Sequence, residues 1–147
     1  MIFRAMLRAD VPALAALDQI CNPPGWSESQ LSQEIDLPHS YHQVAFHFDK
    51  PIGFAVMWIV LEQAQLLEIA IHPKYRRQGK ASLLLNEMIS IAKQKGCHSM
   101  ELELREDNLS AQKLYEKFGF SFEGERKNYY LNSGAAASSA RLMRLKL

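Results

Sequence analysis

A basic, glycine-containing segment at residues 76–81, Arg-Arg-Gln-Gly-Lys-Ala, is the stretch of this sequence whose residue types most directly suggest chemistry. It follows the apolar run Leu66–Ile71 and precedes a strongly amphipathic segment, so we expect a strand followed by the N-terminus of a helix. Such a terminus offers unpaired backbone N–H groups and the positive end of the helix dipole, which together bind phosphates. Gly79 and Ala81 add little side chain, so a pyrophosphate could reach the backbone. An ordinary basic surface loop would have the same composition, so this segment alone leaves both readings open.

Two more side chains have types suited to acid–base chemistry. Glu103 alternates with Leu102 and Leu104 in a predicted strand, so its carboxyl group points to the opposite face and could enter a cleft. Tyr115 lies on the apolar face of a predicted helix but carries a hydroxyl group, and a buried phenol usually finds a polar partner. A strand glutamate is more often a solvated residue, and a tyrosine on an apolar face is more often core.

Length and charge limit the classes of protein to consider. The chain has 147 residues and a formal net charge of +1, which suits one globular domain spanning residues 1–147. This charge gives no bulk electrostatic case for nucleic acid or an anionic membrane, so we expect neither as a partner. Residues 1–8 lack a sustained apolar stretch, and no apolar run approaches the roughly 20 residues that span a bilayer. We therefore expect a cytoplasmic protein.

Cysteine and histidine offer no second chemistry. Cys21 and Cys97 are too few for a disulfide framework, and neither lies in a motif that forms a cleft, so we expect two reduced thiols. Five histidines are scattered along the chain. His39 and His42 are neighbours, but no third or fourth ligand has metal-site spacing, so we expect no metal.

Periodicity and turn residues predict a mixed sheet with helices packed on it, an α/β domain. The expected elements are a helix capped by Asp10, a second helix after Ser27 with a capping box to Gln30, strands near 43–48, 52–62 and 65–72, a helix at 82–94 closed by Gly96, a strand at 99–105, a helix capped by Asn108, a strand from Phe120, and a closing strand at 141–147. We expect residues 132–139, rich in Ser, Gly and Ala, to form a mobile loop. The side chains expected to face inward include Val11, Leu14, Leu17, Ile20, Val44, Phe46 and Phe48.

Four ordered motifs resemble the GCN5-related N-acetyltransferases (GNAT superfamily). Residues 76–81 match its acyl-CoA signature R/Q-x-x-G-x-G/A. The strand at 67–73 precedes that signature, the strand at 101–105 follows it, and residues 108–120 fit N-x-x-A-x-x-x-Y-x-x-x-G-F. Trp26-Ser27, Leu102–Arg105 and Asn128-Tyr129-Tyr130 resemble more closely the bacterial ribosomal-protein-alanine N-acetyltransferases, the RimI family. The resemblance covers nearly the whole chain and implies a single GNAT-like domain with helices on both faces of a mixed sheet.

The resemblance also implies roles for particular residues. Glu103 corresponds to the proposed general base, and Tyr115 to the general acid that protonates the coenzyme thiolate. A bulged strand would present backbone groups of Ile69, Ala70 and Ile71 to acetyl-CoA. The pyrophosphate would lie on the loop formed by Arg77, Gln78, Gly79, Lys80, Ala81 and Ser82, with Asn108 as a helix cap, a pantetheine contact, or both. The acceptor's N-terminus would lie between Trp26, Tyr129 and Tyr130, although all three could equally be packing residues.

The implied activity is transfer of acetyl from acetyl-CoA to the N-terminal α-amine of a protein, with the N-terminal alanine of a small-subunit ribosomal protein as acceptor. Two alternatives stay open: an acetyltransferase for a small amine or a lysine side chain, and a non-catalytic acyl-CoA-binding module. Retention of both Glu103 and Tyr115 argues against the module. The family usually has a proline and an acidic pair after Asn-Tyr-Tyr, which residues 131–139 lack, so acceptor selectivity is open. The sequence does not indicate the oligomeric state.

Overall fold

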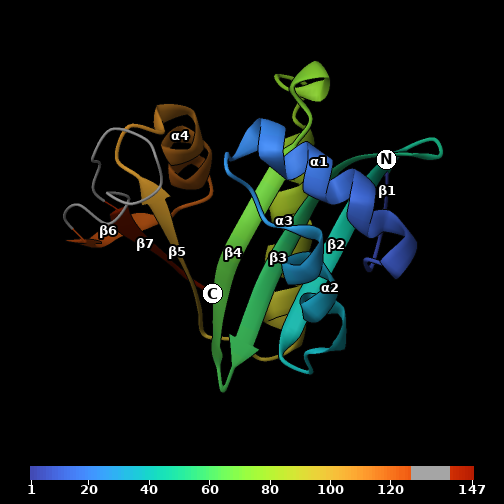
Figure 1. Ribbon diagram of the computed structural model, residues 1–147. Coiled ribbons are helices and arrows are strands. Elements are labelled where there is room, and N and C mark those ends of the chain that lie inside the picture. The colour runs from blue at the N-terminus through green and yellow to red at the C-terminus, as the bar shows by residue number, and fades with distance from the viewer. Residues whose placement is uncertain (127–139) are drawn as a thin grey trace.

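The computed structural model describes residues 1–126 and 140–147. These residues form one seven-stranded sheet with four α-helices (Figure 1). The elements in chain order are β1 (Ile2–Arg4), α1 (Val11–Cys21), α2 (Glu28–Asp36), β2 (Ser40–His47), β3 (Lys50–Val60), β4 (Gln63–Ile71), α3 (Lys80–Gln94), β5 (Ser99–Arg105), α4 (Leu109–Lys117), β6 (Ser121–Arg126) and β7 (Ala140–Lys146), with short 3-10 turns at Arg8–Asp10 and Pro73–Tyr75. The predicted order of helices and strands is confirmed. Strand β1 was not predicted, because three residues are too few to show a period.

The sheet is mixed, as the sequence predicted. Its strand order is β1-β2-β3-β4-β5-β7-β6, and β4–β5 is its parallel pair among neighbours that are otherwise antiparallel. Helices α1 and α2 pack on one face, against a core that includes Leu14, Leu31 and Phe54. Helices α3 and α4 contribute to the core on the other face, which includes Met88 and Tyr115. Helices therefore cover both faces, as expected.

The parallel pair separates halfway along its length. Strands β4 and β5 are paired from Gln63 with Ser99 up to Leu66 with Leu102, and no further. Both strands continue, β4 to Ile71 and β5 to Arg105, so their carboxyl ends diverge (Figure 1). Peptide groups along the diverging edges lack the partners that a continuous ladder would supply, which leaves them available to a ligand.

Strand β4 contains a bulge where the separation begins. Val56 of β3 pairs with Glu68, and the next residue, Met57, pairs with Leu66, so Leu67 is the extra residue. The bulge shifts the alternation of side chains: Leu66 packs in the core on the α3 side, and beyond the bulge Ile69 packs there too. Without the extra residue, Glu68 would point into that apolar core. The bulge instead directs Glu68 to the α1 face.

Three local predictions were wrong. Ile20 is 58% exposed, and the inward positions of α1 include Asp18, which is fully buried. Phe48 is 84% exposed because the chain turns there, with a φ of 54°. Asp10 occupies the N-cap position of α1, but its side chain makes no capping hydrogen bond to that helix.

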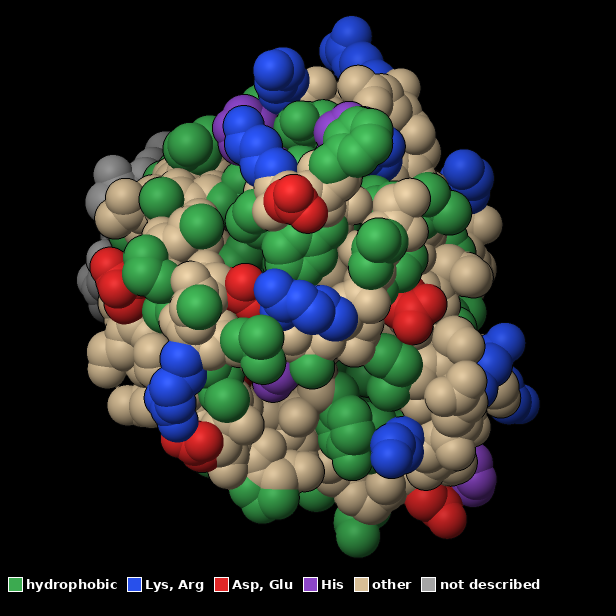
Figure 2. Space-filling view, turned by 90° about the vertical axis from the view of Figure 1, so that its right-hand side faces the viewer, with side chains coloured by type: hydrophobic (Ala, Val, Ile, Leu, Met, Phe, Trp, Pro, Cys, Tyr) green, Lys and Arg blue, Asp and Glu red, His purple; other side chains and the backbone are tan. Residues whose placement is uncertain are grey.

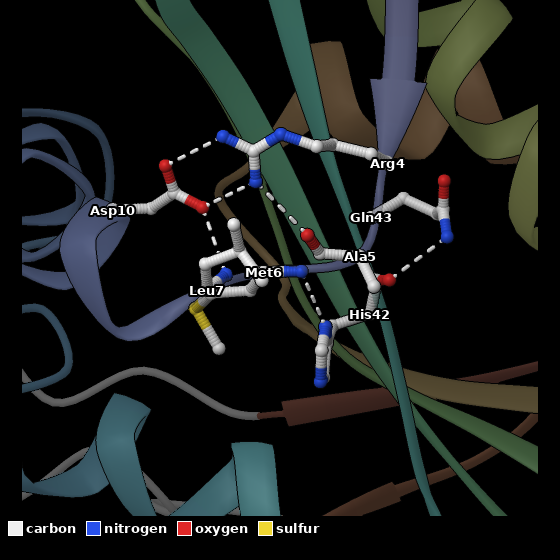
Figure 3. A network of polar contacts seen from close by, with 7 residues as sticks. All are labelled: Arg4, Ala5, Met6, Leu7, Asp10, His42 and Gln43. Carbon is white, nitrogen blue, oxygen red and sulfur yellow. Dashed lines mark hydrogen bonds and ion pairs between the residues drawn. The ribbon is translucent and has the colours of Figure 1, made fainter.

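Asp10 instead organises the N-terminal segment (Figure 3). Arg4 donates to both of its carboxylate oxygens, at 2.6 and 3.0 Å, and the backbone N–H of Leu7 donates to Oδ2 at 2.8 Å. The Arg4 guanidinium lowers the pKa of Asp10. In the same network, the backbone N–H of Met6 donates to Nδ1 of His42 at 2.8 Å, which requires that nitrogen to be unprotonated. Burial lowers the pKa of His42, so the fold favours the neutral imidazole.

This arrangement predicts that His42 makes the fold sensitive to mild acid. Its folded-state pKa is lowered, so as the pH falls below about 6.5 the unfolded chain binds a proton that the folded chain excludes, and stability decreases. Replacement His42→Asn keeps an acceptor near Nδ1 but cannot titrate. Urea unfolding at pH 7.5 and 5.5 should show a smaller loss of stability in His42→Asn than in the wild type.

The matched control is His98→Asn, at a histidine that is 76% exposed beside Glu62. It should lose stability between the two pH values as the wild type does. An equal loss in the wild type and in His42→Asn would show that His42 is not responsible.

Candidate active site

A cleft of about 1010 Å³ opens where β4 and β5 diverge. Four parts of the fold line it: residues 21–26 at the end of α1 and after it, residues 66–69 of β4, residues 102–105 of β5, and Asp107, Asn108, Ala111 and Tyr115 before and within α4. The C-terminal end of α1 reaches toward this gap, and α4 lies on its other side (Figure 1). The cleft therefore joins segments that are far apart in the sequence.

The predicted acid and base both line this cleft. Glu103 is half-buried, while its strand neighbours Leu102 and Leu104 are buried in the core on the α3 side. Tyr115 is 6% exposed, and its ring contacts Phe120 at a centroid distance of 5.6 Å. The Tyr115 hydroxyl makes no hydrogen bond to any residue in the ranges 1–126 and 140–147. A buried phenol without a protein partner is suited to a ligand in the cleft.

Electrostatics keeps that phenol protonated. Burial raises the pKa of Tyr115 well above its ordinary value, and the nearby Glu68 raises it further. The hydroxyl is therefore a hydrogen-bond donor throughout the ordinary pH range.

Two of the three residues predicted to offer backbone contacts, Ile69 and Ile71, have peptide groups that face the gap. The N–H of His72 donates to Ile52 of β3 at 2.8 Å, so by alternation Ala70 directs its peptide groups toward β3, while Ile69 and Ile71 direct theirs toward the gap. The Ile71 carbonyl accepts from Cys21 Sγ at 3.3 Å and from Arg76 Nε at 3.2 Å, which agrees with that direction. We therefore retain Ile69 and Ile71 as candidate ligand contacts and leave Ala70 out.

The predicted phosphate loop lies beyond the end of β4, outside the residues that line the cleft, where Arg76 ties it to Ile71. Arg77 and Gly79 both have left-handed backbone, with φ of 61° and 72°. Helix α3 begins at Lys80, and its first helical hydrogen bond is from Leu83 N to Gly79 O at 3.1 Å. Within the described ranges, the N–H groups of residues 80–82 donate to no other residue. A turn of this kind at a helix N-terminus is a concave anion site.

The remaining predicted residues fall into two groups. Asn108 lines the cleft and also caps α4, accepting from Ala111 N at 3.2 Å, so both predicted roles are compatible. Trp26, a predicted acceptor contact, lines the cleft, and the capping box of Ser27 and Gln30 follows it as predicted. Tyr129, Tyr130 and the loop expected at 132–139 lie outside the described residues.

A polar cluster at the floor of the cleft was not predicted from the sequence. Asp18, Asn22 and Glu68 meet there. Asp18 and Asn22 belong to no motif, and Glu68 lies in the matched strand at 67–73, where its side chain was given no role. Cys21 was also misplaced, because it lines the cleft. Burial raises the pKa of the Cys21 thiol, which disfavours the thiolate, and its proton is donated to the Ile71 carbonyl. Both cysteines are free thiols, as expected.

Surface charge and metal ligands add little to the description of the site. On the face shown in Figure 2, basic, acidic and apolar side chains of the described residues are interspersed. The described ranges contain no group of three or more His, Cys, Asp or Glu residues placed to hold a metal ion. None of the helices in those ranges is long and apolar enough to span a membrane.

Comparison with known proteins identifies the family. Residues 11–120 match the acetyltransferase (GNAT) family. The chain belongs to this family. It is 36% identical to the ribosomal protein bS18-alanine N-acetyltransferase of Haemophilus ducreyi, over 99% of this chain and 100% of that protein. It is 33% identical to the corresponding enzyme of Escherichia coli K12, over 82% of this chain and 81% of that protein.

The fold gives the same result. The crystal structure of the ribosomal-protein-S18-alanine N-acetyltransferase from Escherichia coli superposes with a TM-score of 0.90 at 29% identity, covering 99% of this chain and 92% of that one. The predicted GNAT fold and the predicted resemblance to ribosomal-protein-alanine acetyltransferases are both confirmed.

The observed site suits the acetyl-CoA that GNAT enzymes use. Unpaired N–H groups at the start of α3 suit a pyrophosphate, the open edge of β4 suits amide groups of a pantetheine arm, and the unpartnered Tyr115 hydroxyl suits a sulfur atom in the cleft. The N–H groups at the start of α3 and the Tyr115 hydroxyl are polar groups whose partners the described part of the protein does not supply.

Replacing Gly79 should therefore weaken coenzyme binding. A Cβ at Gly79 would meet no atom within 4 Å, but φ of 72° is strained for a β-branched residue, so Gly79→Val should distort the turn. We expect acetyl-CoA affinity to fall by at least about tenfold, roughly 1.4 kcal/mol, in titration calorimetry.

Gly96→Val is the matched control. Gly96 closes the other end of α3 and has φ of 82°, and a Cβ added there would likewise meet no atom within 4 Å. It should lose similar stability and keep its affinity. Unchanged affinity in a folded Gly79→Val protein would mean that the phosphate loop is misassigned.

Proposed function

We propose that this protein transfers the acetyl group of acetyl-CoA to the N-terminal α-amine of ribosomal protein bS18, at an N-terminal alanine. The observation that carries the proposal is the full-length likeness to the Haemophilus ducreyi enzyme, 36% identical over 99% of this chain. The cleft supports it, because one cavity brings together Glu103, Tyr115 and Trp26 from three different parts of the chain.

The chemistry requires a neutral amine, a held carbonyl and a proton for the departing sulfur. Acetyl-CoA, when bound, supplies a thioester whose carbonyl carbon is open to attack by an amine. Glu103 accepts the proton that the amine loses, directly or through water. An α-amine has a pKa near 8, against about 10.4 for lysine, so this base has a modest task. Tyr115 donates its phenolic proton to sulfur, and the peptide N–H groups of Ile69 and Ile71 orient the ligand along β4.

Transfer is direct in this proposal, without an acyl-enzyme. Cys21 is the nucleophilic side chain that lines the cleft, but burial raises its pKa and its proton is engaged with the Ile71 carbonyl. A thiol in that state is a poor nucleophile. Amine and thioester therefore react in one ternary complex.

The first test concerns the acceptor. Short peptides differing only at residue one, each with an internal lysine, are incubated with acetyl-CoA and read by mass spectrometry. We expect acetylation of the α-amine rather than of the internal lysine, because the lower α-amine pKa leaves more neutral nucleophile at pH 7.5. Alanine should be preferred over bulky first residues, because the similar enzymes act on an N-terminal alanine. Peptides with a blocked N-terminus should remain unmodified. Equal modification of blocked and free peptides would point to lysine acetylation, and no modification of any peptide would favour the binding-module alternative.

The second test concerns Glu103 and Tyr115. Glu103→Gln keeps the size of the side chain but removes the base, and Tyr115→Phe keeps the packing but removes the proton donor. Each should lower kcat by about 10²–10⁴-fold with little change in acetyl-CoA affinity. Because the pKa of Tyr115 is raised far above 10, its ionisation should not produce a basic limb in the wild-type pH profile below about pH 10.

Two conservative variants serve as controls. Glu101→Gln changes the carboxylate two residues before Glu103 on the same strand, beside Arg144 at 3.7 Å and outside the cleft. Tyr41→Phe removes a hydroxyl from a partly buried tyrosine of β2. Both should retain activity. Full activity in Glu103→Gln would place the base elsewhere, and full activity in Tyr115→Phe would make that tyrosine a packing residue.

A further inference from the structure

Asp18, Asn22 and Glu68 form a hydrogen-bonded cluster between the end of α1 and the bulge of β4. The Asn22 amide nitrogen donates to Asp18 Oδ1 at 3.0 Å, to Glu68 Oε1 at 3.1 Å and to the Ile69 carbonyl at 3.4 Å. The other oxygen of Asp18 accepts from the backbone N–H of Trp26 at 2.8 Å. The cluster thus connects the loop that carries Trp26, on the acceptor side, with the strand edge predicted to hold the coenzyme.

The contacts indicate where the proton of this cluster lies. Both oxygens of Asp18, which is fully buried, accept from N–H groups, and the Asn22 amide nitrogen bonds at once to Asp18 Oδ1 and Glu68 Oε1, at 3.0 and 3.1 Å, which brings the two carboxyl groups side by side. Two ionised carboxylates at that separation would repel strongly, so the pair holds one proton. Asp18 uses its oxygens as acceptors, which leaves Glu68 to carry the proton and donate it to Asp18.

The surroundings of Glu68 agree with this assignment. Burial, followed by the effect of Asp18, raises the pKa of Glu68 to about 9. The ionisable groups that face it or share the cleft are Asp18 and Cys21 on α1, Tyr115 on α4, Glu103 and Arg105 on β5, and Asp107. Arg76, which precedes the phosphate loop, bonds to the Ile71 carbonyl.

We propose that protonated Glu68 is a positioning residue, which holds the acceptor-side loop at residues 22–26 against the bulged strand through Asp18 and Asn22. The proposal rests on the proposed function for its link to the acceptor, since Trp26 is a predicted acceptor contact. Glu68 takes no part in proton transfer to or from the reacting atoms. Its proton stays between the two carboxyl groups, and ionisation of Glu68 at high pH breaks the cluster and releases the loop.

Two substitutions at Glu68 separate this role from that of a base. Glu68→Gln replaces the donated O–H by an amide N–H and keeps the acceptor for Asn22, so it mimics the protonated acid at every pH. Glu68→Leu removes both interactions. Asn22→Ala removes the bridging amide by an independent route, and Glu28→Gln removes an exposed carboxylate next to the same loop as a control.

Hydrogen exchange read by mass spectrometry tests the cluster without any substrate. At pH 7, residues 21–27 should exchange faster in Glu68→Leu and Asn22→Ala than in the wild type, with residues 84–92 of α3 as the internal reference. Glu68→Gln and Glu28→Gln should match the wild type. Unchanged exchange in both Glu68→Leu and Asn22→Ala would overturn the proposal.

Kinetics tests the consequence for the acceptor. At pH 7.5, Glu68→Leu should raise the acceptor KM at least about tenfold with kcat changed less than about threefold, and Glu68→Gln should stay within about twofold of the wild type in both. Between pH 7.5 and 9.5 the wild-type KM should rise relative to that of Glu68→Gln, because only the wild type can ionise there. If Glu68→Gln loses activity as Glu68→Leu does, an ionised carboxylate is required and the proposal is wrong. If the wild type acetylates no peptide, the proposed function fails while the exchange experiment still decides the role of Glu68.

Discussion

The rest of this structure depends on one constraint, which is that the parallel strands β4 and β5 separate partway along their length. Strands β4 and β5 stay together up to Leu66 and Leu102, and the bulge at Leu67 follows at once. A parallel ladder continued to Ile71 would satisfy every peptide group of β4 and leave no cleft. Its interruption creates the cavity and directs the peptide groups of Ile69 and Ile71 toward it. It also turns Glu68 away from the apolar core.

The rest of the sheet keeps this gap from collapsing. Strand β7 pairs with β5 along its whole length, from Ser99–Lys146 to Arg105–Ala140, so the outer strand of the gap is held on its far side. Strand β3 holds β4 in the same way, and α1 closes the cleft through Asn22 and Cys21. The two strands that border the cavity are thus fixed by ladders on their far sides. This is what a site needs when its own polar groups are to remain available for a ligand.

Features set by local chemistry could be predicted from the residues themselves, whereas the bulge in β4 was expected only from the resemblance to the GNAT superfamily. Gly79 precedes α3 and Gly96 follows it, and both have the left-handed backbone that glycine adopts without strain. Ser27 and Gln30 form the predicted capping box. The bulge leaves no local signature, because Leu67 fits a regular strand equally well. Asp18 was not predicted to be buried, because a charged residue on an apolar helix face is usually exposed, and Ile20 was assigned to the buried face instead. The pairing of Asp18 with Glu68 is a tertiary contact between α1 and β4, which no periodicity encodes.

Three carboxyl groups differ in their effect on the stability of the fold. Asp10 accepts from Arg4, its pKa is lowered, and it therefore stabilises the fold at neutral pH. Buried Glu34 accepts from Ser40 and Trp58 at 2.9 and 2.6 Å, so its oxygen is well satisfied. Glu68 differs, because its pKa is raised to about 9. Between about pH 4.5 and 9 the unfolded chain gives up a proton that the folded chain retains, so stability falls as the pH rises through that range. An apolar residue at this position would avoid that loss, and a carboxyl group that lowers stability at the floor of the catalytic cleft is therefore best explained by a role in the site.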